Sequence, residues 1–351
     1  MRLKWLKVGV WIECCVILCC TCLFMFRSDE FVQTSAEANK EETSKEQQKT
    51  ERDFIKWVDF SVSYEALCAA YEYDVETYGQ EVHVEWIPLL AYTAVRTGGE
   101  FSKDALTIMA KTKEELCAKE ITMEDLTADL KYYDYYLEAY DAVLHEYVGE
   151  YQAAADIQGK SENVTAVKNA SETRYGLKVF SPIARGFSYS DYDDFGTSRD
   201  YGYSRPHLGH DMMGLIGTPV IAVEGGTVEA LGWNQYGGWR IGIRSDDTKR
   251  YYYYAHLRQN RPYAEGRKEG DRVASGDVIG YMGHTGYSTE ENVNNIESVH
   301  LHFGIQLIFD ESQEDGNGEI WIDCYDLTRF LSRNRSEVVR DDETKEWRRV
   351  Q

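Results

Sequence analysis

The sequence has little proline, few basic residues and almost no cysteine outside one segment. Only 5 of the 351 residues are proline and 43% are hydrophobic, which excludes a disordered or collagen-like chain because the apolar material suffices for a core. The sequence has 38 Lys and Arg residues and 60 Asp and Glu residues, so its net charge is −22. This acidity argues against a nucleic-acid partner, since nucleic-acid binding depends on a basic face.

Cysteine is abundant in only one place. Five of the 8 cysteines lie between residues 14 and 22, within an apolar run. The other three, Cys68, Cys117 and Cys324, are far apart, and no CxxC pair lies outside the run. This placement argues against a zinc ribbon or a disulfide scaffold, and it leaves open one disulfide among these three cysteines.

An apolar run at residues 8–26 has about the length of a helix that crosses a bilayer, for which roughly 20 residues are needed. Basic residues precede the run and acidic residues dominate after it, which places the N-terminus in the cytoplasm and the rest outside. We expect residues 1–27 to form a cytoplasmic tip and a single-pass signal-anchor in the cell membrane, with an extracellular C-terminal bulk. A cleaved signal peptide is the alternative, with the same extracellular placement.

The remaining chain divides into two folded parts joined by polar segments. We expect a helical domain followed by a β domain. The helical domain is acidic, because residues 51–150 hold 22 acidic and 8 basic residues. The boundaries are a polar stalk at 28–51, the helical domain at 52–155, a linker at 156–174, the β domain at 175–335 and a polar tail at 336–351.

Apolar periodicity predicts the elements of the helical domain. Helices are expected over about 62–78 and 86–95. Apolar residues from Leu126 to Tyr151 recur in alternating steps of four and three, which predicts one further helix. Thr122 and Asp125 fit a capping box at its start.

Short β-branched runs between glycine-rich turns predict the second domain, because many short strands without intervening helices favour an antiparallel sheet. Gly225-Gly226 is expected to form a tight hairpin, and residues 324–331 a helix. The runs are 219–223, 227–231, 240–244, 251–256 and 278–282. The fold class is therefore α+β.

Six of the 8 histidines lie in the β domain. Because side chains alternate along a strand, His300 and His302 would share one face while Leu301 faces the core. A loop entering a strand could bring His207 and Asp211 to one point. Two histidines and one carboxylate can hold a catalytic zinc ion with an open position, and further imidazoles can take or supply protons.

Four segments together resemble the lysostaphin-type (LytM-like) zinc metallopeptidases, in family order over residues 180–308. They are His207-Leu-Gly-His-Asp211, Tyr254-Ala-His256-Leu, Gly276-Asp-Val-Ile-Gly280-Tyr-Met-Gly283-His-Thr-Gly286 and His300-Leu-His302-Phe. The resemblance implies an antiparallel sheet of the duplicated hybrid motif type with a groove over the metal.

The resemblance also implies roles for individual residues. His207, Asp211 and His302 would bind one Zn²⁺ per domain, and His256 and His300 would be the catalytic histidines. Which of the two accepts the proton from water is left open. The implied activity is a zinc metalloendopeptidase that cleaves stem peptides or cross-links of bacterial peptidoglycan.

Other residues of the β domain are expected to have supporting roles. His210 is expected at the surface or behind the metal ligands, and His284 in a structural turn. The segments 187–203 and 287–299 are expected to border the groove. One tyrosine of the first segment could aid the oxyanion. The candidates are Tyr189, Tyr192, Tyr201 and Tyr203.

Two alternatives differ in class from a solitary hydrolase. In one, the protein is a catalytically silent wall-binding scaffold, although such a protein typically lacks a ligand and none is missing here. In the other, the helical domain contacts an envelope protein of a larger machine, such as a sporulation channel or a DNA-transfer apparatus.

Overall fold

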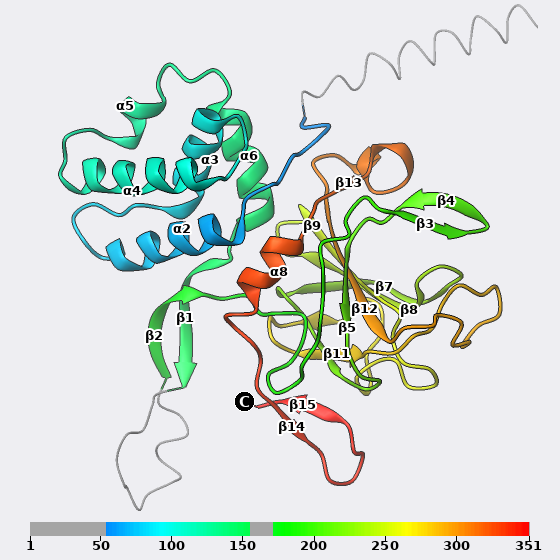
Figure 1. Ribbon diagram of the computed structural model, residues 1–351. Coiled ribbons are helices and arrows are strands. Elements are labelled where there is room, and N and C mark those ends of the chain that lie inside the picture. Colours follow the sequence, from blue (N-terminus) through cyan, green and yellow to red (C-terminus); the bar gives the residue numbers. More distant parts are fainter. Residues whose placement is uncertain (1–53, 155–170, 351) are drawn as a thin grey trace, which may run out of the picture. The chain divides into compact units, whose positions relative to one another are not determined.

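The computed structural model describes residues 54–154 and 171–350. The described residues from 55 onward form one compact unit, in which α2–α6 gather in one group and the strands of the large sheet in another (Figure 1). The predicted membrane segment at 8–26 lies outside the described residues. Among those that are described, no helix combines the length and apolarity needed to cross a bilayer.

Between residues 54 and 147 the structure describes five helices: α2 (Tyr64–Thr77), α3 (Trp86–Thr97), α4 (Lys103–Cys117), α5 (Met123–Thr127) and α6 (Tyr133–Leu144). The helices predicted at 62–78 and 86–95 are confirmed as α2 and α3. The capping box is confirmed too, because the Asp125 backbone N–H donates to Thr122 and the Asp125 carboxylate accepts from the Thr122 backbone. Helix α4 was not predicted.

The single helix predicted from Leu126 to Tyr151 is wrong. The chain leaves helical geometry after α5, re-enters it in α6, and then continues as strand β1 (Val148–Ala154). Strand β1 pairs with β2 (Ser171–Leu177), which begins within the predicted linker. Tyr147 is fully buried and its hydroxyl lies 3.0 Å from that of Tyr252, so tertiary contacts outweigh the local periodicity.

A seven-stranded antiparallel sheet forms the C-terminal part, in the order β10-β7-β8-β9-β12-β13, with β5 also paired to β12. These strands are β5 (His210–Met213), β7 (Gly226–Asn234), β8 (Gly238–Ser245), β9 (Arg250–Ala255), β10 (Arg272–Val273), β12 (His300–Leu307) and β13 (Ile320–Trp321). The predicted class, a mainly antiparallel sheet with a small helical region, is confirmed.

Three two-stranded pairs accompany this sheet: β3 (Ser198–Tyr201) with β4 (Tyr203–Pro206), β6 (Pro219–Ile221) with β11 (Val278–Tyr281), and β14 (Val338–Arg340) with β15 (Trp347–Arg349). The other elements are the 3₁₀ turns η1 (Glu311–Gln313) and η2 (Gly316–Gly318) and helix α8 (Tyr325–Leu331). The predicted helix at 324–331 is thus confirmed as α8. The predicted polar tail instead folds back as β14 and β15.

The hairpin predicted at Gly225-Gly226 is wrong, because β6 pairs with β11 whereas β7 pairs with β8 and β10. Gly226 instead allows β7 to pack closely against β8. A Cβ atom there would lie 2.1 Å from the carbonyl oxygen of Arg244, so only glycine lets these strands approach.

One hydrophobic core extends through both parts. Phe330 of α8 lies with its ring centroid 5.6 Å from that of Tyr71 on α2 and 5.9 Å from that of Trp86 on α3. The three cysteines outside the apolar run, Cys68, Cys117 and Cys324, are all free, so they form no disulfide.

A buried charge network also joins the two parts. The Arg250 guanidinium on β9, only 1% exposed, contacts both carboxylate oxygens of Glu224 at 2.9 and 3.1 Å. It also donates to Asp247 at 2.9 Å and to the carbonyl of Ala142 on α6 at 2.8 Å. The Tyr252 hydroxyl donates to Glu224 at 2.5 Å. Every strong donor of this arginine therefore has an acceptor.

Replacing Arg250 with glutamine is expected to destabilise the protein by about 3–5 kcal/mol, because Glu224 would keep a buried charge without its counter-ion. Urea unfolding followed by circular dichroism measures the change. The matched control is Arg272→Gln, which removes the same charge from an exposed pair with Asp246 and should leave the midpoint unchanged. Equal midpoints for the Arg250 variant and the wild type would contradict the assignment.

Candidate metal centre

The floor of the site is strand β12. His300 and His302 point to one face, while Leu301 and Phe303 are buried on the other, as the alternation predicts. Strand β5 pairs with β12 in antiparallel register, and His302 lies directly opposite Asp211. Directly opposed residues of an antiparallel pair have neighbouring side chains, so the strand pairing itself brings the carboxylate to the imidazole.

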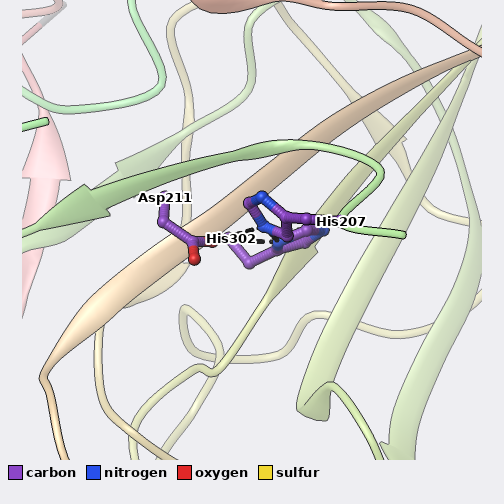
Figure 2. Close-up of side chains that lie close together, drawn as sticks. All are labelled: His207, Asp211 and His302. Atoms are coloured by element: carbon purple, nitrogen blue, oxygen red, sulfur yellow. Dashed lines mark hydrogen bonds and ion pairs between the residues drawn. The ribbon is translucent and has the colours of Figure 1, made fainter. Parts of the chain in front are cut away.

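His207 reaches the same point from the loop between β4 and β5 (Figure 2). Gly209 lets this loop lie close against β12. A Cβ atom at Gly209 would lie 2.6 Å from the Phe303 carbonyl oxygen and 2.7 Å from the His302 imidazole. Glycine at this position is thus a packing requirement of the site.

The donor atoms of His207, Asp211 and His302 converge. Asp211 Oδ1 lies 3.0 Å from both His207 Nε2 and His302 Nδ1, and these two nitrogens are 2.9 Å apart. Ligands of a tetrahedral zinc ion lie about 2.0–2.2 Å from the metal and therefore roughly 3.3–3.6 Å from one another. The observed spacing is within a few tenths of an ångström of that value, so the three side chains could hold a metal ion.

The protonation pattern also favours a cation. His207 Nδ1 lies 3.2 Å from the Asp194 carbonyl oxygen and 3.3 Å from Asp194 Oδ1, so the proton of a neutral ring belongs on Nδ1. The lone pair on Nε2 then faces the Asp211 carboxylate and His302 Nδ1.

Two residues behind the ligands were not singled out in the sequence. Arg199 on β3 forms an ion pair with the buried Asp194 and a second one with Asp211 Oδ2, at 3.3 Å. Arg199 thereby contacts the carboxylate oxygen that faces away from His207, and Asp194 orients the His207 ring. Such outer contacts fix the direction of a ligand. No spacing pattern reveals them, since they come from a loop and a short hairpin.

His256 and His300 flank the metal ligands. Their ring centroids lie 4.7 Å apart, and His300 Nε2 is 3.7 Å from Asp211 Oδ1. His256 follows the last residue of β9, where strict alternation would turn it toward the core beside Tyr254. Its backbone φ of 59°, rare outside glycine, instead brings the ring to the site.

Each of these two rings is held by one backbone acceptor. His256 Nδ1 lies 2.9 Å from the Thr285 carbonyl oxygen, and His300 Nδ1 lies 2.9 Å from that of Ser298. When either ring is neutral, its proton belongs on Nδ1 and its Nε2 is an acceptor. Burial lowers the pKa of His256 well below its ordinary value, which keeps this ring neutral and able to accept a proton.

The other two histidines of the domain lie elsewhere. His210 is buried, not at the surface, with Nδ1 2.7 Å from the Thr328 hydroxyl and Nε2 3.2 Å from Asp191. It therefore packs behind β5 against α8. His284 Nδ1 lies 2.8 Å from the Ile296 carbonyl oxygen, consistent with a structural turn.

A groove of about 1030 Å³ opens over the metal ligands. The segments expected at its border do contribute, the first through Tyr192 and Tyr203 and the second through Tyr287 and Ser298. Tyr189 and Tyr201 do not line the groove. The Tyr201 ring instead stacks on that of Tyr287, with a centroid distance of 5.0 Å.

Comparison with known proteins places this site in a family. The model of Peptidase family M23 matches residues 205–315, which include all five predicted site residues. Residues 205–315 thus form a domain similar to Peptidase family M23, the M23 domain. A solved structure from Ruminococcus gnavus, provisionally named a glycyl-glycine endopeptidase LytM, shares the fold with a TM-score of 0.52 at 23% identity, over 80% of this chain and 91% of that one.

Two curated relatives are similar to part of this chain. The L-Ala–D-Glu endopeptidase of Bacillus subtilis is 40% identical over 152 residues, which cover 43% of each chain. The glycyl-glycine endopeptidase ALE-1 of Staphylococcus capitis is 32% identical over 140 residues, 40% of this chain and 33% of that one. The match therefore spans less than half the length of each relative.

Replacing Asp194 with asparagine is expected to weaken divalent-cation binding by about 10- to 100-fold, because the His207 ring loses its orienting carboxylate. Competition with a chromophoric chelator measures the affinity. Asp193→Asn removes the same charge from an exposed neighbour and should bind as tightly as the wild type. Equal affinities for both variants would refute the role of Asp194.

Proposed function

We propose that the M23 domain is a zinc metalloendopeptidase that hydrolyses peptide bonds of bacterial peptidoglycan, using one zinc ion per domain. The convergence of His207, Asp211 and His302 carries this proposal. Two neutral imidazoles and one carboxylate would leave a bound zinc ion with a net charge of +1. When bound, zinc lowers the pKa of water and polarises a carbonyl group.

His256 and His300 supply the proton chemistry in this proposal. Each ring donates its Nδ1 proton to a backbone carbonyl and keeps Nε2 directed at the groove. One ring can therefore accept a proton from the attacking water and deliver it to the leaving amine, while the other hydrogen-bonds the developing oxyanion. The two rings have equivalent tautomers, so their geometry supports either assignment.

The substrate class comes from the relatives and from the groove. The two curated relatives are named for cleavage of L-Ala–D-Glu and of Gly–Gly bonds. A groove of about 1030 Å³ can accommodate an extended peptide. The scaffold alternative is not favoured, because every expected ligand and both catalytic histidines are in place.

We further propose that the apolar segment at 8–26 anchors the protein in the cell membrane and leaves the M23 domain outside the cell, where peptidoglycan lies. The basic residues before the segment and the acidic residues after it support this orientation. In this arrangement the acidic helical part is available to an envelope partner.

Comparison of histidine variants tests the activity. His302→Ala should lose both bound zinc and the release of peptides from purified sacculi, because it removes one of three ligands. His300→Ala should keep its zinc but lose about 10²- to 10⁴-fold in rate. His145→Ala, in the helical part, is the matched control and should behave as wild type. Full activity of His302→Ala would exclude the assigned site.

Fractionation of bacterial cells tests the anchor. The full chain should sediment with membranes, resist extraction by high salt and be digested by protease added to cells from which the wall has been removed. A chain that lacks residues 1–27 should be found in the soluble fraction. Protection of the full chain from the external protease would contradict the proposed orientation.

A further inference from the structure

The groove continues from the metal ligands across the neighbouring strands. His302 on β12 pairs with Ala255 on β9. On β8, Ile241 pairs with Tyr254, so the preceding Arg240 lies beside Ala255 on the groove face of the sheet. Adjacent strands are about 4.8 Å apart, which places the Cα atom of Arg240 about 10 Å from that of His302. The residue between them, Ala255, has only a methyl side chain and also lines the groove.

Arg240 has no carboxylate partner among the described residues. Two other arginines that line the groove are neutralised: Arg199 pairs with Asp194 and Asp211, and Arg244 pairs with Glu229 and Glu314. In contrast, no described carboxylate forms an ion pair with Arg240, and its Nη1 atom is buried without a hydrogen-bond partner. No carboxylate of the described residues therefore balances the charge that Arg240 brings to the groove.

Arg205 on β4 is a second guanidinium of this kind. Its Nη1 atom is also buried without a partner, and no described carboxylate pairs with it. Its position is fixed by two aromatic rings of the groove, because the guanidinium carbon lies 4.8 Å from the Tyr236 centroid and 5.3 Å from the Tyr287 centroid. Its Nη2 donates to the Tyr287 hydroxyl at 3.2 Å. This arginine is thus held in place before any ligand binds.

The composition of the chain makes these two arginines notable. With 60 acidic against 38 basic residues, carboxylates are in excess, yet none of those in the described part of the chain pairs with these two guanidinium groups. A guanidinium group recognises a planar carboxylate through paired hydrogen bonds. A peptide made only of glycine offers no side-chain carboxylate to such a pair.

We propose that Arg240 and Arg205 form a subsite for a free carboxylate of the peptide substrate, which makes the enzyme selective for acidic stem peptides over neutral ones. The proposal rests on the proposed function. An extended peptide advances about 3.3–3.6 Å per residue. The 10 Å between Arg240 and His302 therefore places the carboxylate within about three residues of the cleaved bond.

Two matched peptides test the subsite in the full-length protein. Both contain an L-Ala–D-Glu bond; one carries the free carboxylate of the glutamyl residue and the other carries its amide. The wild type should cleave the acid with a kcat/KM about 10- to 100-fold higher, the effect of losing a charged hydrogen-bond partner. Arg240→Gln and Arg205→Gln should each lower kcat/KM for the acid and leave that for the amide unchanged. Arg272→Gln, which removes an exposed charge, should keep the full preference.

Calorimetry on chelator-treated protein separates this proposal from the catalytic one, because binding is then measured without turnover. The acid should bind at least about 10-fold more tightly than the amide, and Arg240→Gln should abolish the difference. Equal binding of both peptides to the wild type would overturn the subsite even if the protein cleaves peptidoglycan. Preferential binding without cleavage by the zinc-loaded protein would support the subsite and refute the proposed activity.

Discussion

The antiparallel pairing of β5 with β12 is the constraint on which the candidate site depends. It sets Asp211 opposite His302, and the alternation along β12 then directs His300 to the same face. A shift of one residue in this register would turn the histidines of β12 into the core. Burial of Leu301 and Phe303 on the opposite face opposes such a shift, so the hydrophobic core and the metal ligands are selected by the same register.

Two irregular backbone segments next to this strand pair bring His207 and His256 to the site. Gly209 allows the His207 loop to lie against β12, and the left-handed φ of His256 directs its ring to the metal face. Strained or tightly packed backbone at such points is retained only where surrounding contacts determine it. The Thr285 carbonyl, which accepts from His256, is one of these contacts.

The arginines of the protein differ in whether the described residues provide them with a counter-ion. Arg250 is fully neutralised by Glu224 and Asp247 and binds the carbonyl of Ala142, so it joins the helical part to the sheet. Arg240 and Arg205 in the groove lack such partners among the described residues. The same side chain therefore contributes to structure where its donors are satisfied and becomes available to a ligand where they are not.

Much of the site follows from the sequence alone. The alternation in His300-Leu-His302 determines a shared face, the glycine-rich turns and β-branched runs determine an antiparallel sheet, and His207, Asp211 and His302 could be proposed as ligands from their motifs. The first two features depend on neighbouring residues, whose geometry is set locally, whereas the ligand set was implied by the resemblance of the motifs to a known family. The tertiary structure alone decided the rest. The expected helix up to Tyr151 ends at Leu144 because β1 pairs with β2, and β6 separates from β7 because each finds a different partner strand. Asp194 and Arg199 reach the ligands, and Arg240 and Arg205 the groove, only through contacts between segments distant in the chain, and local spacing carries no information about such contacts.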